Sequence, residues 1–112
     1  MKLTNAEHAI VAAPKILYLL SAEKSGGKDK FFERSGFSVA QWEVLQAAVL
    51  QHGQAYDTVN VVTTDFGVKY VVEGKLSTPD GLNPFVRSIW QIDHGETVPR
   101  FVTAYPVQEK TR

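Results

Sequence analysis

The second half of the chain places the strongest constraint on the fold. From Tyr56 onward, β-branched and aromatic residues form runs that predict strands at about 57–64, 68–76, 85–93 and 99–105. Turn-forming residues separate the runs: Asp65-Phe66-Gly67, Thr78-Pro79-Asp80-Gly81 and His94-Gly95. Connections this short predict antiparallel neighbours in sequential order, because a parallel pair needs a crossover of roughly a dozen or more residues.

The first half carries helical signals instead. Pro14 suits the first turn of a helix, and an apolar stripe follows it. A second helix is predicted at about 28–35, closed by Gly36 in the left-handed conformation. A third helix is predicted to begin at Ser38, where Ser38-Val39-Ala40-Gln41 has the pattern of a capping box, and to end at Gly53.

Length and composition agree with one domain. The chain has 112 residues, of which 44% are hydrophobic and 21% charged, as in ordinary globular domains. We expect a single α+β domain over residues 1–112, with an ordered core at about 5–107. Its N-terminal helices would pack on one face of a four-stranded antiparallel β-meander. A cytoplasmic protein without a membrane segment is expected, because no apolar run is long enough to cross a bilayer and no secretory leader is recognisable.

The charges balance over the whole chain but not along it. Twelve Lys and Arg residues face twelve Asp and Glu residues, so the formal net charge is zero. Dedicated nucleic-acid binders usually have a basic excess, since phosphate contacts dominate their affinity. The distribution still allows a local basic patch. Five bases crowd one stretch: Lys15, Lys24, Lys28, Lys30 and Arg34.

The chain lacks the residues that several classes of reaction require. The chain has no cysteine, which excludes disulfides, thiolate metal sites and cysteine nucleophiles. Its histidines, His8, His52 and His94, do not have metal-ligand spacing. A serine-hydrolase motif and a dinucleotide fingerprint are also missing, so we expect neither a metal nor a cofactor. The Gly26-Gly27 pair exposes backbone amides that favour an anion, although a flexible basic loop is the alternative interpretation.

Strand alternation divides the sheet residues between two faces. Four residues of the second strand are expected to face the helices: Val68, Tyr70, Val72 and Leu76. With Val102 and Ala104 also facing the helices, the other face would carry Phe101 together with two cations and two hydroxyl groups. These four are Lys69, Arg87, Thr103 and Tyr105. Such a set suits phosphate binding and proton donation. The alternative is a solvated face with ordinary cross-strand pairs.

Three stretches of the chain are distinctive. They are Gly27-Lys28-Asp29-Lys30-Phe31-Phe32 with Gly36-Phe37, then Arg87-Ser88-Ile89-Trp90, and then Pro99-Arg100-Phe101-Val102-Thr103-Ala104-Tyr105-Pro106. Together they resemble a bacterial domain family of unknown function. The resemblance runs from about Asn5 to Val107 and implies a family without implying an activity.

The order of helices before a four-stranded sheet also resembles the barnase, EndoU, colicin and RelE-like nuclease toxins. Colicin-D-like transfer-RNA nucleases in that group carry an early Lys-x-Lys-His element and a late Ser-x-Trp element. Lys28-Asp29-Lys30 and Ser88-Ile89-Trp90 are similar to these elements. Phe31 stands where the catalytic histidine would be. The general base would therefore have to be His8, Tyr105 or a lysine.

The first hypothesis for function is a small metal-independent ribonuclease, the toxin of a toxin–antitoxin or contact-inhibition pair, with RNA as substrate. Its candidate catalytic residues are Lys28, Lys30, Arg87, Ser88, Thr103 and Tyr105. Its candidate substrate-binding residues are Lys24, Lys69, Trp90 and Arg100, although Trp90 also suits the core of a central strand.

The second hypothesis is a non-catalytic protein-interaction module, such as an immunity or accessory protein. The neutral net charge and the phenylalanine at position 31 favour it. The face of the sheet away from the helices would then be a protein interface, bearing Phe85, Ile89, Phe101 and Tyr105. The expected partners are RNA and a cognate antitoxin or immunity protein.

Overall fold

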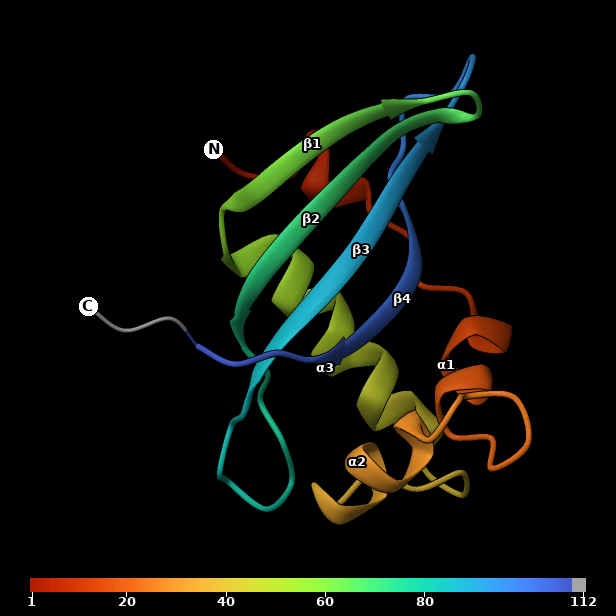
Figure 1. Ribbon diagram of the computed structural model, residues 1–112, viewed down its shortest axis with the longest axis vertical. Helices are drawn as coiled ribbons and strands as arrows, with labels where there is room; N and C mark the ends of the chain where they lie inside the picture. The colour runs from red at the N-terminus through yellow and green to blue at the C-terminus, as the bar shows by residue number, and fades with distance from the viewer. Residues whose placement is uncertain (110–112) are drawn as a thin grey trace.

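The computed structural model describes residues 1–109 and has helices followed by a four-stranded sheet (Figure 1). In chain order the elements are η1 (Ala6–His8), α1 (Ala13–Leu19), α2 (Lys28–Arg34), α3 (Trp42–Ala55), β1 (Thr58–Thr64), β2 (Gly67–Lys75), β3 (Phe85–Asp93) and β4 (Arg100–Pro106). The strand order is β1-β2-β3-β4, and every neighbouring pair is antiparallel. The predicted α+β fold with a sequential meander is therefore confirmed.

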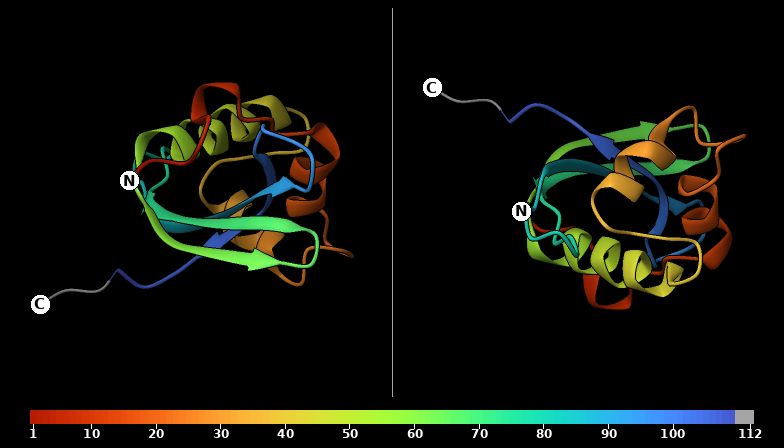
Figure 2. Two further views of the ribbon diagram at one scale, coloured as in Figure 1. Left: turned by 90° about the horizontal axis from the view of Figure 1, so that it is seen from above. Right: turned by 90° about the horizontal axis from the view of Figure 1, so that it is seen from below.

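The helices cover one face of the sheet. α3 runs across β2 and β3, and α1 lies beside β4 (Figures 1 and 2). Buried apolar side chains fill the space between the layers: Leu3, Ile16, Leu19, Phe32, Phe37, Leu45, Val49, Val72, Val86, Trp90 and Phe101. Within residues 1–109 no helix covers the opposite face, which we call the open face. None of the helices described combines the length and apolarity that crossing a membrane requires.

The first two helices form where the sequence predicts them. Pro14 lies in the first turn of α1, and Gly36 follows α2 with a positive φ of 105°. The amide of Gly36 donates to the carbonyl of Glu33, and the amide of Phe37 donates to that of Phe32. Only a residue without a Cβ adopts this backbone conformation freely, so Gly36 ends the helix.

Both predicted ends of the third helix were wrong. The Ser38 hydroxyl accepts a hydrogen bond from the Gln41 amide, but Gln41 has a non-helical backbone, and α3 begins only at Trp42. At the other end, α3 continues through Gly53 to Ala55. Gly53 is buried beneath the indole of Trp90, where an added Cβ would lie 2.6 Å from Cε2. The glycine allows close approach of helix and sheet and does not end the helix.

A β-bulge in β4 reverses the predicted direction of the Phe101 side chain. Thr103 pairs with Ile89, whereas Phe101 pairs with Trp90, so Val102 is an extra residue in the strand. The extra residue shifts the alternation by one position. Phe101 is therefore 1% exposed in the core, with its ring 5.4 Å from that of Trp90. The expectation that Phe101 lies on the open face was wrong, and the expectation for Thr103 agrees with the pairing.

A buried polar network joins α3 to β2 and β3. Nε2 of His52 lies 3.1 Å from the carbonyl oxygen of Gly74 and 3.0 Å from that of Val86. Carbonyl oxygens only accept, so Nε2 carries the hydrogen. Nδ1 then accepts from the Ser88 hydroxyl at 2.8 Å, and that hydroxyl accepts from the indole N–H of Trp90 at 2.8 Å. Each buried polar side-chain group in this network has a partner while His52 is neutral.

Substitution of Gly53 by alanine tests the close approach of α3 and the sheet. Helix propensity alone would stabilise the variant by about 0.5–1 kcal/mol. The new methyl group would overlap the rigid Trp90 ring, so we expect a net loss of about 1–3 kcal/mol in the free energy of unfolding. Urea denaturation measures the difference. An increase in stability would show that Trp90 does not restrict this position.

The His52 network predicts a loss of stability in mild acid. Burial lowers the pKa of His52, so below about pH 6.5 the unfolded chain binds a proton that the folded chain does not. Stability should therefore fall as the pH drops from 6.5 to the lowered pKa of the folded state, by at most about 1.4 kcal/mol per pH unit from this group. Urea denaturation between pH 5 and pH 8 measures it, with His94→Gln as the exposed control. An unchanged slope in His52→Gln would contradict the assignment.

Candidate functional site

A groove of about 500 Å³ lies where α1, the start of α2 and β4 meet. Its lining residues are Pro14, Lys15, Tyr18, Lys28, Val102 and Thr103. We call it the α1–β4 groove. The bulge helps to form it, because Val102 and Thr103 both reach the groove from consecutive positions of β4. Two of the residues expected at the site, Lys28 and Thr103, come together here.

Lys28 is held between two aromatic rings. Its Nζ lies 5.8 Å from the ring centroid of Tyr18 and 5.9 Å from that of Tyr105, which is within range for cation–π attraction. The first turn of α2 fixes the backbone of Lys28. The buried Ser25 hydroxyl donates to Asp29 at 2.9 Å and accepts from the Asp29 amide at 3.0 Å. Lys28 makes no ion pair within residues 1–109, so its charge is free for a ligand.

Thr103 has an unsatisfied hydroxyl group. Its Oγ1 is the one buried side-chain nitrogen or oxygen atom, among the residues described, that lacks a hydrogen-bond partner. Leaving such a group unpaired costs about 1–3 kcal/mol, so native structures rarely tolerate it without a reason. Thr103 also lines the α1–β4 groove, so the unpaired hydroxyl belongs to a residue in the wall of that groove.

Arg87 and Tyr105 form a pair on the open face, beside Lys28. Nη1 of Arg87 donates to the Tyr105 hydroxyl at 3.3 Å, and Nε donates to Oε2 of Glu73 at 2.7 Å. These two hydrogen bonds raise the pKa of Arg87 above its usual value. Because the Tyr105 oxygen accepts from Arg87, its own hydrogen remains available to donate to a ligand. Glu73 already neutralises Arg87, which the sequence reasoning did not anticipate.

Arg100 is likewise occupied by a carboxylate. Nε and Nη2 of Arg100 donate to the two carboxylate oxygens of Asp93, at 2.7 and 3.1 Å. This forked pair, helped by a hydrogen bond from Gln91, lowers the pKa of Asp93. Lys69 pairs with Gln91 across the strands and makes no ion pair in the described part of the chain. Neither Lys69 nor Arg100 lines the α1–β4 groove.

Two of the expected site residues lie in the core. Ser88 is 1% exposed and Trp90 is fully buried, and both belong to the His52 network. β3 alternates between the faces, so these two point to the helices while Arg87 points to the open face. Neither is placed to contact RNA in this structure. The protein interface expected on the open face also has fewer accessible side chains, because Ile89 is only 8% exposed and Phe101 is in the core.

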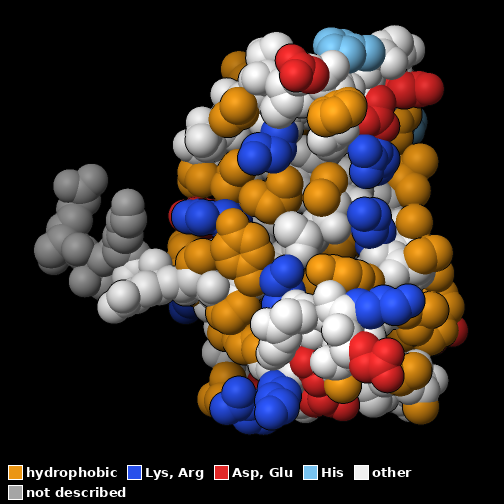
Figure 3. Space-filling model, turned by 45° about the vertical axis from the view of Figure 1, so that its right-hand side comes forward, with side chains coloured by type: hydrophobic (Ala, Val, Ile, Leu, Met, Phe, Trp, Pro, Cys, Tyr) orange, Lys and Arg blue, Asp and Glu red, His pale blue; other side chains and the backbone are white. Residues whose placement is uncertain are grey.

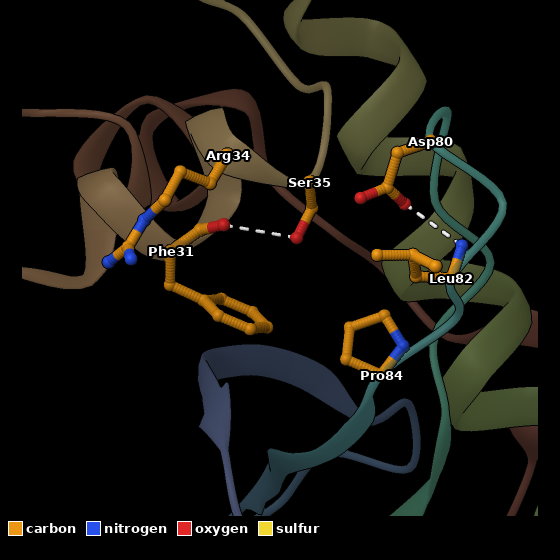
Figure 4. Close-up of a pocket in the computed structure, with 6 residues that line it drawn as sticks. All are labelled: Phe31, Arg34, Ser35, Asp80, Leu82 and Pro84. Carbon is orange, nitrogen blue, oxygen red and sulfur yellow. Dashed lines mark hydrogen bonds between the residues drawn. The ribbon is translucent and has the colours of Figure 1, made fainter.

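The basic residues of the 24–34 segment are dispersed. Lys30 is exposed on α2 but does not line the groove, because residues two apart on a helix point in different directions. Lys24 lines a separate hollow beside α1. Phe31 points into a third hollow of about 300 Å³ between α2 and the β2–β3 loop, facing Leu82 and Pro84 (Figure 4). The position that would hold a histidine in colicin-D-like nucleases therefore lies outside the α1–β4 groove.

Two residues of the groove were not expected from the sequence to be site residues. Lys15 and Tyr18 are three positions apart on α1, a spacing that places both on one side of the helix. That spacing was the signal in the sequence that the two side chains lie together. Only the packing of α1 beside β4 shows that this side of the helix faces the groove. Lys and Arg side chains gather with hydrophobic ones over the middle of this side of the molecule, between acidic groups near its two ends (Figure 3). Within residues 1–109, no three His, Asp or Glu side chains are grouped to hold a metal ion.

The unsatisfied hydroxyl of Thr103 predicts an unusual response to substitution. Thr103→Val keeps the β-branched shape and removes the unpaired group, so we expect stability to stay the same or rise by up to about 1 kcal/mol. Thr64→Val is the matched control. The Thr64 hydroxyl donates to the carbonyl of Gly67 and accepts from the amide of Phe66, so its loss should destabilise by about 0.5–1.5 kcal/mol. Thermal unfolding compares the two variants. A larger loss for Thr103→Val than for Thr64→Val would contradict this account.

Comparison with known proteins supports the family and the fold. A family model described as a domain of unknown function (DUF6883) matches residues 2–108. No curated protein sequence matches the chain significantly. A solved structure with a similar fold is a chain of a contact-dependent growth inhibition toxin–immunity protein complex from Klebsiella pneumoniae 342. It has a TM-score of 0.68 and 19% sequence identity, over 88% of this chain and 99% of that one. The match over nearly the whole length confirms the expected family: the chain belongs to the domain family of unknown function DUF6883.

Proposed function

We propose that this chain is a small metal-independent endoribonuclease, and that the α1–β4 groove is its active site. The observation that carries the proposal is the buried Thr103 hydroxyl without a partner, in a groove where Lys15 and Lys28 have no carboxylate partner within residues 1–109. Two cations and an unpaired donor suit a phosphate group, whose oxygens accept charge-assisted hydrogen bonds.

The proposed reaction is attack of a ribose 2′-hydroxyl on the adjacent phosphorus. The bond from phosphorus to the 5′-oxygen breaks, which leaves a 2′,3′-cyclic phosphate and a 5′-hydroxyl. Lys28 and Lys15 stabilise the negative charge that develops on the phosphate, and Thr103 donates to a non-bridging oxygen. Tyr105, whose oxygen accepts from Arg87, supplies the proton to the leaving 5′-oxygen. Solvent water takes the proton that the 2′-hydroxyl loses as its oxygen bonds to phosphorus, and solvent water returns a proton to Tyr105. No histidine lines the groove, so the proposed roles use lysine, threonine and tyrosine side chains.

The fold supports a role within a toxin pair. The related structure is a chain of a toxin–immunity protein complex, and an unchecked ribonuclease would require a protein inhibitor in its own cell. On this proposal the biological partner is a cognate antitoxin or immunity protein. Its natural target would be the α1–β4 groove, because a protein covering Lys28 and Thr103 excludes RNA.

A second candidate function is a protein-interaction module, such as an immunity protein. The same structural match permits it, and β1 is the feature of the chain that favours it. β1 is an edge strand without a charged residue, and Val59 and Val61 on it are each more than half exposed. Uncharged, exposed edge strands are ready to pair with a strand of another chain. The experiment below separates the two candidates.

The ribonuclease proposal predicts cleavage of single-stranded RNA in the presence of a metal chelator. Lys28→Ala and Tyr105→Phe should each lower the cleavage rate by about 10²–10³-fold, from the loss of charge stabilisation and of the proton donor. Lys75→Ala, an exposed cation at the end of β2 outside the groove, should cleave at the wild-type rate. End-group analysis of the products should find 2′,3′-cyclic phosphates.

Intact RNA after prolonged incubation with the wild-type protein would overturn the proposal and leave the interaction module as the better candidate. Cleavage that persists in both Lys28→Ala and Tyr105→Phe would also overturn it, since a contaminating nuclease would then be responsible. Expression in a bacterial host provides a second readout. Growth arrest by the wild-type protein and not by Lys28→Ala is the expected result.

A further inference from the structure

A second hollow adjoins the α1–β4 groove across α1. The hollow measures about 380 Å³ and is lined by Pro14, Leu17, Tyr18, Ser21 and Lys24. We call it the α1 outer hollow. Pro14 and Tyr18 line both depressions, so these two side chains form the ridge between them. The outer hollow has its own cation, Lys24, which makes no ion pair within residues 1–109.

The ridge presents an aromatic ring between cations. Tyr18 is 39% exposed, so part of its side chain is accessible to a ligand. Lys28 lies on the groove side of the ridge with its Nζ 5.8 Å from the ring centroid, and Lys24 lies on the other side. A sequence of cation, aromatic face and cation matches a single nucleic-acid strand, in which phosphates alternate along the backbone with bases that stack on aromatic rings.

We propose that Tyr18 is a base-stacking platform, and that a single RNA strand crosses α1 from the α1–β4 groove to the α1 outer hollow. One base stacks on Tyr18, the phosphate on its groove side contacts Lys28 and Lys15, and the next phosphate contacts Lys24. This inference rests on the proposed function and names its substrate class. Paired bases in a duplex are stacked within the helix and do not expose a face to Tyr18, so the substrate is unpaired RNA.

Binding to two oligonucleotides of equal charge tests the platform. One is a fluorescently labelled oligoribonucleotide with 2′-O-methyl groups, which cannot be cleaved by 2′-hydroxyl attack. The other has the same phosphates but lacks the central bases. Fluorescence anisotropy measures both affinities for the wild-type protein and for Tyr18→Ala, Tyr18→Phe, Tyr18→Leu and Lys28→Ala. Phe66→Ala is the control, because this ring is exposed on the β1–β2 turn, away from α1 (Figure 1).

The expected pattern separates stacking from charge. Tyr18→Ala and Tyr18→Leu should lose about tenfold in affinity for the complete oligonucleotide and little for the one without bases, since stacking contributes roughly that factor per base. Tyr18→Phe keeps the ring and should bind both as the wild type does. Lys28→Ala should weaken both and reduce the dependence on salt. Phe66→Ala should change neither, and melting temperatures confirm that every variant is folded.

Three results would overturn the inference. Tyr18→Ala could weaken binding of both oligonucleotides equally, or of neither, while the wild-type protein binds and cleaves RNA. In that case the stacking platform is wrong and the ribonuclease proposal stands. If Tyr18→Leu binds as well as Tyr18→Phe, the side chain contributes apolar bulk and not stacking. If the wild-type protein binds neither oligonucleotide, both the platform and the proposed function are wrong.

Discussion

The contact of α3 with the centre of the sheet is the interaction on which the rest of the structure depends. The indole of Trp90 packs directly against the backbone of Gly53, and its N–H joins the Ser88 and His52 network one residue away on the helix. Apolar packing sets the distance between the layers, while the directional hydrogen bonds set their register. A shift of α3 by one residue would bury His52 without partners, which a low-dielectric interior penalises strongly.

The position of Trp90 also determines where the candidate site forms. Phe101 packs edge-on against Trp90, and the bulge at Val102 lets Phe101 reach the core while Thr103 stays outside it. α1 then packs beside β4, and the groove arises between them. The groove is therefore supported by the core without being part of it. This explains how Thr103 keeps an unsatisfied hydroxyl, a local cost of about 1–3 kcal/mol that a well-packed domain tolerates at a binding site.

Ion pairs within the sheet decide which cations are available. Arg87 and Arg100 are each neutralised by a carboxylate from the same sheet, Glu73 and Asp93. The lysines around α1, which are Lys15, Lys24 and Lys28, have no such partner among the described residues, so their charges are available beside the groove although the net charge of the chain is zero. Tyr105 links the two regions, since it accepts from Arg87 and also borders Lys28.

The sequence by itself determined the elements, their order and the antiparallel meander. Local turn chemistry, period-two alternation and short connections are enough for these, because each depends on neighbouring residues. Only the tertiary structure decided the ends of α3, the bulge in β4 and the partners of the charged groups. Gly53 suggests a helix end in the sequence, but in the structure it lies within α3 against Trp90. Phe101 lies on the opposite face from the one expected because β4 has one extra residue. The sequence named Lys28, Thr103 and Tyr105. The packing of α1 beside β4 added Lys15 and Tyr18, and burial against α3 placed Ser88 and Trp90 in the core.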